Sequence, residues 1–200
     1  MTENATDAEL DAVEVEPEED EPPELDAETR ARRDRALAHV RKFGDPVLRT
    51  RARDVGRFDE ELVQEAERMG RLMNDAIGVG LAATQVGVLH RLLVYRVHPQ
   101  SPVVALVNPE LEWAGRDEES LEEGCLSLPG VHVQVERPVF VRVRARNEHG
   151  EPVLIEAAGL EARVIQHEMD HLDGVLVLDR ISRSERKEAM RALRAALGDG

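Results

Sequence analysis

One stretch in the first half of the chain repeats apolar residues at helical spacing. An aspartate that can cap a helix, Asp59, precedes the stretch, and glycines that can end it stand at positions 78 and 80. The pattern predicts a helix from about residue 59 to residue 77. Its buried face would carry Leu62, Ala66, Met69, Met73 and Ala76.

The middle of the chain has short apolar runs and alternation with a period of two. The runs at 92–97 and 103–107 are rich in β-branched residues, and valines at 131, 133 and 135 and at 139, 141 and 143 alternate with other residues. The segment NEHG at 147–150 predicts a hairpin turn into a strand at 153–155. These segments are therefore predicted to be strands.

Two more helical patterns lie near the C-terminus. One runs from about Leu160 to Leu172, and the other from about Ser182 to Leu197, with Leu197 expected to pack inward. Because the strands occupy the middle and the helices are segregated from them, the order predicts an α+β fold. We expect antiparallel sheets around the central helix at 160–172, with a separate C-terminal helix.

Charge is distributed unevenly along the 200 residues. The net charge is -15, but residues 1–29 hold thirteen Asp and Glu and no Lys or Arg. We expect a disordered acidic tail at 1–29 and one domain at 30–200. The nearly neutral domain has no basic footprint for specific DNA binding, and no apolar run approaches the roughly 20 residues of a membrane span. A single cysteine and the lack of a signal peptide favour a cytoplasmic protein.

The segment QHEMDH at 166–171 carries the clearest candidate chemistry. His167 and His171 are four residues apart, so on a helix both imidazoles can reach one divalent metal, with Glu168 beside it as a general base. The helix does not identify the third ligand. Asp173 and Asp179 are candidates downstream, and Cys125 in EGCLS is a candidate upstream. One thiolate and two imidazoles would leave one position free for catalysis.

Three segments together resemble the peptide deformylase family: GVGLAATQ at 78–85, EGCLS at 123–127 and QHEMDH at 166–171, within a likeness from about residue 38 to residue 196. The resemblance implies a bacterial hydrolase that removes the formyl group from the N-terminal formylmethionine of new polypeptides and releases formate. It implies Cys125, His167 and His171 as ligands and Glu168 as the proton carrier. Gln85 and the backbone N–H of Leu126 would stabilise the oxyanion.

The sequence indicates the identity of the metal and the residues of the substrate pocket less directly than it indicates the metal ligands. The ligand types suit zinc, nickel or cobalt as well as ferrous iron, which is the metal that the resemblance implies. The methionine side chain needs an apolar pocket, for which Val79, Leu121, Leu160 and Val164 are candidates, and Gly80 permits close approach of the substrate. We expect Arg163 to point away, and Glu123 either to pair with Arg137 or to face solvent.

Two alternatives to a deformylase remain at this point. A zinc endopeptidase could use the same helix, and a non-enzymatic binding protein could use the acidic tail.

Nascent formylmethionyl chains are the expected substrate. The C-terminal helix would present a basic stripe that could meet ribosomal phosphates, and the resemblance implies docking there. That stripe consists of Arg183, Lys187, Arg191 and Arg194.

Overall fold

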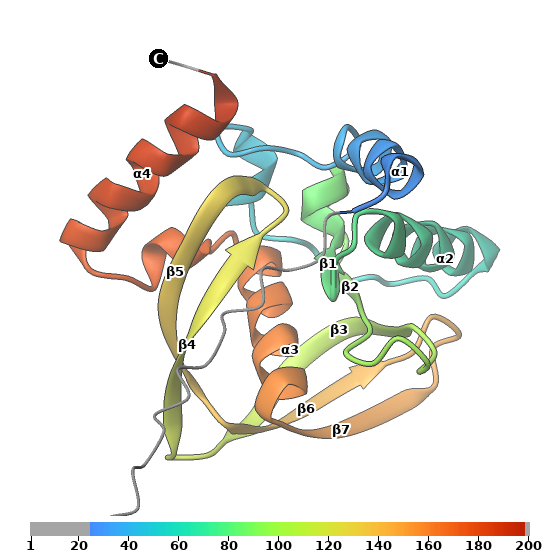
Figure 1. Cartoon of the computed structure of the whole chain (residues 1–200). Helices are drawn as coiled ribbons and strands as arrows, with labels where there is room; N and C mark the ends of the chain where they lie inside the picture. Colours follow the sequence, from blue (N-terminus) through green and yellow to red (C-terminus); the bar gives the residue numbers. More distant parts are fainter. Residues whose placement is uncertain (1–24, 199–200) are drawn as a thin grey trace, which may run out of the picture.

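The computed structural model describes residues 25–198, which form two antiparallel sheets and four α-helices (Figure 1). The helices are α1 (Ala27–Leu37), α2 (Glu60–Asp75), α3 (Gly159–Leu172) and α4 (Arg183–Leu197), with short 3-10 turns η1 (Pro46–Arg49), η2 (Ala83–Val86) and η3 (Val177–Asp179). The strands are β1 (Gly80–Ala82), β2 (Leu92–Tyr95), β3 (Val104–Ala114), β4 (Glu118–Cys125), β5 (Leu128–Pro138), β6 (Phe140–Arg146) and β7 (Pro152–Ala158).

Helix α3 lies between the two sheets. The larger sheet has the order β1-β2-β3-β6-β7, and β4 pairs with β5 in the smaller one. All of these neighbours are antiparallel. Helix α3 contacts strands of both sheets, as Figure 1 shows. The predicted α+β fold around a central helix is therefore confirmed.

Helix α3 is largely buried, and one apolar face anchors it in the core. Ala162, Ile165 and Leu172 are inaccessible to solvent and join a cluster with residues of β2, β3 and β6. Burying a leucine or isoleucine completely stabilises the fold by roughly 1.5–3 kcal/mol. This packing fixes the position of the polar residues that the same helix carries.

Helix α2 follows the predicted pattern closely. The Asp59 side chain accepts a hydrogen bond from the Leu62 N–H, and the buried face packs against β1 and β2. The helix ends at Asp75, and Ile77 follows in a left-handed conformation (φ 58°). That turn directs the chain from α2 into β1, which lines the functional site.

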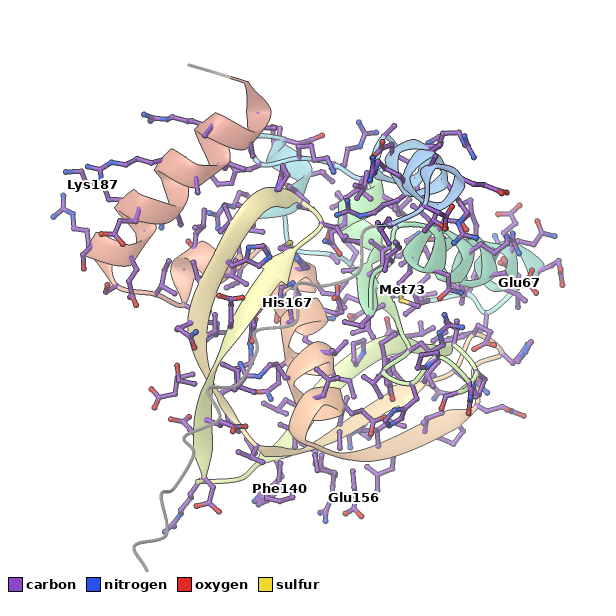
Figure 2. All side chains as sticks on the ribbon, in the orientation of Figure 1. Glu67, Met73, Phe140, Glu156, His167 and Lys187 are labelled. Atoms are coloured by element: carbon purple, nitrogen blue, oxygen red, sulfur yellow. The ribbon has the colours of Figure 1, made fainter. Side chains whose placement is uncertain are left out.

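Helix α4 packs on β5 of the smaller sheet through Ala189 and Leu193. Its basic residues are exposed, and Figure 2 shows Lys187 on the outer side of the helix. Leu197 is 44% exposed, so the expectation that it packs inward was wrong. No described helix has both the length and the apolar character that crossing a membrane would require.

Two longer elements and the short strand β1 were not predicted from the sequence. Strand β4 pairs along its whole length with β5, and α1 begins at Ala27 with Asp26 as its N-cap. Residues 1–24 of the predicted acidic tail lie outside the described residues. The predicted boundary at residue 29 was wrong, because residues 27–29 belong to α1.

Candidate metal centre and substrate cavity

Two elements bring one thiol and two imidazoles together. Strand β4 ends at Cys125, and α3 carries His167 and His171 one turn apart. The Cys125 Sγ lies 3.2 Å from His171 Nε2, and the candidate ligand atoms of all three residues lie within 4.8 Å of one another. Asp173 instead binds Arg91, and Asp179 binds Arg49 and Arg186. Of the candidate third ligands, only Cys125 joins the histidines.

The electrostatics of this cluster suit a divalent cation. Burial disfavours a thiolate at Cys125, but the neighbouring imidazoles outweigh it and hold the pKa of the thiol well below its usual range. The thiolate and the two imidazoles are a donor set that zinc, iron, nickel and cobalt all accept. The residues present therefore fit a metal.

A buried carboxylate fixes the orientation of one ligand. Glu123 is 6% exposed, and its Oε2 lies 3.0 Å from Nδ1 of His167, which leaves Nε2 of that ring for a metal. Arg137 donates to both Glu123 oxygens, at 2.6 and 3.0 Å, and Arg163 donates to Oε1 at 2.8 Å. Burial tends to raise the pKa of Glu123, but His167 and Arg137 lower it to about 2. The expected pairing with Arg137 is confirmed.

Glu168 stands beside the ligands and is nearly inaccessible to solvent. Burial raises the pKa of its carboxyl group above the usual range, and Oε2 has no hydrogen-bond partner within the described part of the chain. Gly80 of β1 faces it so closely that a Cβ there would lie 2.8 Å from Cγ of Glu168. The glycine therefore makes room for the carboxylate.

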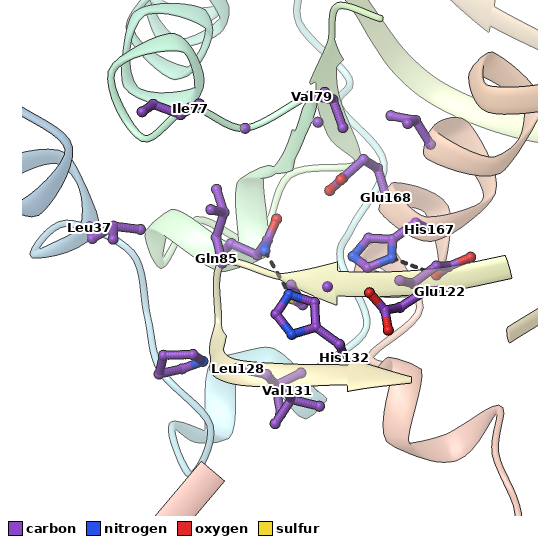
Figure 3. Close-up of a pocket in the computed structure, with 18 of the residues that line it drawn as sticks. Leu37, Ile77, Val79, Gln85, Glu122, Leu128, Val131, His132, His167 and Glu168 are labelled. Atoms are coloured by element: carbon purple, nitrogen blue, oxygen red, sulfur yellow. Dashed lines mark hydrogen bonds and ion pairs between the residues drawn. The ribbon is translucent and has the colours of Figure 1, made fainter. Parts of the chain in front are cut away.

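These side chains form the wall of a cavity of about 390 Å³ (Figure 3). Gln85 is 2% exposed; its Oε1 accepts from the Ala82 N–H at 2.9 Å, and its Nε2 lies 3.7 Å from the Cys125 sulfur. Leu126 also lines the cavity, and its backbone carbonyl accepts a hydrogen bond from Lys42 Nζ at 2.9 Å. The cavity thus combines a carboxylate of raised pKa, an amide N–H donor and a candidate metal centre.

Comparison with known proteins identifies the family. The sequence model described as "Polypeptide deformylase" matches residues 37–187. This chain belongs to the peptide deformylase family. It is 48% identical over 161 residues to a peptide deformylase of Acidothermus cellulolyticus, covering 80% of this chain and 88% of that one. The enzyme removes the N-formyl group from nascent polypeptides in a metal-dependent reaction, so neither the endopeptidase nor the non-enzymatic alternative holds.

Solved structures of peptide deformylases agree with the fold. One from Synechococcus elongatus, in complex with actinonin, is 44% identical with a TM-score of 0.71, covering 80% of this chain and 85% of that one. One from Legionella pneumophila is 39% identical with a TM-score of 0.75, covering 78% of this chain and 92% of that one. The family-model match at residues 37–187 includes both sheets and α3, and with them Cys125, His167 and His171.

The enzyme's cavity contains most, but not all, of the predicted substrate residues. Val79, Gly80, Leu160 and Val164 line it, whereas Leu121 does not and is 42% exposed on β4. The opposite wall was not predicted, because its residues lie far from these along the chain and share no local pattern with them. Figure 3 shows that wall formed by Leu37, Leu128 and Val131.

The expectation that Arg163 points away from the cavity was wrong. Arg163 is 6% exposed, lines the cavity and donates to the carbonyl oxygens of Val135 (2.8 Å) and Glu119 (2.6 Å) as well as to Glu123. A buried glutamate 40 positions upstream provides the counter-charge that helical spacing alone could not reveal.

Proposed function

We propose that Cys125, His167 and His171 hold the metal of this deformylase and that it is ferrous iron. The observation that carries the proposal is the convergence of a thiolate and two imidazoles beside a buried carboxylate, with Cys125, His167 and Glu168 in the cavity wall. The family resemblance supports iron, although zinc, nickel and cobalt suit the same ligands. Elemental analysis of protein purified without oxygen from unsupplemented cells tests the metal, and zinc in place of iron would contradict it.

The bound metal would act as a Lewis acid that activates water and polarises the formyl oxygen. Glu168 takes a proton from the attacking water and passes it to the leaving nitrogen of methionine; its raised pKa supports both steps. Gln85 Nε2 and the Leu126 N–H donate to the oxygen on which negative charge develops. Glu123 holds His167 in place and takes no proton.

Apolar side chains at the α3 side of the cavity would receive the methionine. Leu160 and Val164 lie on α3, Val79 precedes β1, and Gly80 leaves space for the substrate backbone. Leu121 is omitted from this pocket because it does not line the cavity. A formyl carbon carries only hydrogen besides its oxygen and nitrogen, so a narrow site beside Glu168 would exclude bulkier acyl groups.

The decisive experiment is formate release from a formyl-Met peptide by the wild-type enzyme and by Glu168→Gln. The substitution keeps the shape of the side chain but removes the base, so kcat should fall by roughly 100- to 10,000-fold. Metal content and unfolding temperature should stay near the wild-type values. Near-normal turnover of the variant at saturating substrate would refute the role of Glu168.

We propose further that the enzyme works in the bacterial cytoplasm and meets nascent chains at the ribosome through α4. The exposed basic stripe of that helix supports this contact, because its charges could bind rRNA phosphate. Removing α4 would uncover β5, so replacing the stripe with glutamate is the better test. Co-sedimentation with ribosomes at low salt should fall while turnover of a short peptide is kept, and unchanged co-sedimentation would refute the contact.

A further inference from the structure

Helix α1 supplies part of the substrate cavity, although the family-model match includes only its last residue. The family match begins at residue 37, and α1 spans Ala27–Leu37. Both Arg33 and Leu37 line the cavity. Ala36 is buried, and Arg32 pairs with Asp75 of α2 at 3.7 Å, so the helix is held against the enzyme body.

Arg33 is the arginine of α1 that is placed to meet a ligand. Its side chain is half-buried, and no described carboxylate forms an ion pair with it. By contrast, Arg32 has Asp75, and Arg30 donates to the Leu25 carbonyl. Arg35 is exposed and lies outside the cavity. A partly buried guanidinium without an internal counter-charge favours an anion from outside.

A second cation strengthens the positive charge at this end of the cavity. Lys42 also lines it, and its Nζ is engaged by the Leu126 carbonyl at 2.9 Å. Burial lowers the pKa of Lys42, the Cys125 thiolate counteracts this, and the positive charge of Arg33 lowers it further. Arg33 is therefore close enough for its charge to act at the cavity, while Lys42 already has a partner.

The cavity has two ends with different chemistry. The α3 end carries Leu160 and Val164, and the α1 end carries Leu37 and Arg33 (Figure 3 shows Leu37 opposite His167 and Glu168). With the formyl group at the metal centre and methionine at the apolar α3 end, the following residues extend past the α1 end. Glu122, which also lines the cavity, is exposed and forms no ion pair with a described cation.

We propose that Arg33 is a specificity-determining residue that binds a carboxylate side chain on one of the first two residues after the formylmethionine. The proposal rests on the proposed placement of formylmethionine. It predicts that the enzyme deformylates nascent chains with an early aspartate or glutamate faster than chains with an early lysine. The selectivity comes from a residue that lies before the family-model match.

The test measures kcat/KM by formate release for three formyl-Met peptides that carry Asp, Ala or Lys at the next two positions. The wild-type enzyme should prefer the Asp peptide, and Arg33→Ala should lower kcat/KM for that peptide about three- to fivefold, as expected for a partly exposed ion pair. Turnover of the Ala peptide should change less than about twofold. Arg33→Glu should favour the Lys peptide, and added salt should weaken each preference.

Arg35→Ala is the matched control, because it removes the same charge from the same helix outside the cavity. It should keep the wild-type preference. An unchanged ratio between Asp and Lys peptides in Arg33→Ala would overturn the proposal, as would an equal change in Arg35→Ala. An equal loss for all three peptides would also overturn it and assign Arg33 a structural role. The role of Arg33 is tested by the Arg33 and Arg35 variants, and the proposed catalytic function by Glu168→Gln. Either proposal can therefore fail without the other.

Discussion

Gly80→Ala tests how tightly the structure positions Glu168. The added Cβ would lie 2.8 Å from Cγ and 2.9 Å from Cδ of Glu168, whereas ordinary contacts begin near 3.4 Å. The carboxylate would have to retreat by at least about 0.6 Å, since it is buried and Gly80 is paired with Tyr95 of β2. Misplacing a reacting group by about 1 Å can reduce a rate 100-fold. We expect kcat/KM to fall roughly 10- to 100-fold.

Steady-state formate release, metal content and thermal unfolding should be measured together for this variant. Metal content should stay at the wild-type level, because the three atoms nearest to the added Cβ all belong to Glu168 and none to a proposed ligand. Gly56→Ala is the control: it adds the same methyl group where no heavy atom lies within 4 Å. If Gly80→Ala keeps wild-type kcat/KM, then Glu168 has room to move, and its proposed role as a precisely placed base is refuted.

Two other substitutions test the ligands and their support. Cys125→Ala should lose bound metal together with activity, because it removes the only anionic ligand; full metal occupancy without activity would instead indicate a nucleophilic cysteine. Glu123→Gln should lower the free energy of unfolding by about 3–5 kcal/mol, because Arg163 would remain buried without a carboxylate partner and Arg137 would keep only Asp170. It should also weaken metal binding about 10- to 100-fold through His167, and the exposed neighbour Glu122→Gln should do neither.

The sequence predicted those parts of the enzyme that depend on local spacing. Helices α2 and α3 were found because apolar residues recur every three or four positions, and the same spacing places His167 and His171 one turn apart. Strands β5 and β6 were found because their buried valines alternate. In each case one face of the element packs against the core, so apolar residues recur in the sequence at the spacing of that helix or strand.

Elements without such a period were missed. Strand β4 reads EESLEEGC, and Glu123 is its only fully buried residue, so it carries no apolar alternation. Helix α1 buries only Ala36 and is otherwise mostly charged. The buried position of Arg163 escaped prediction for a related reason, because its counter-charge comes from β4 and not from its own helix.

Strand β4 explains why the helix motif is incomplete by itself. Helix α3 can present two imidazoles and a carboxylate, but nothing within it fixes the His167 ring or supplies an anionic ligand. One strand provides both: Glu123 lies at Nδ1 of His167 and Cys125 at Nε2 of His171, and the register of β4 against β5 shifts between Gly124 and Cys125. Arg137 on the paired strand β5 then neutralises Glu123 and also binds Asp170 of α3 at 2.9 Å. The hairpin thereby secures the helix and His167 through one buried network and also carries Cys125, the proposed third ligand, so a change in the register of β4 would disrupt all three.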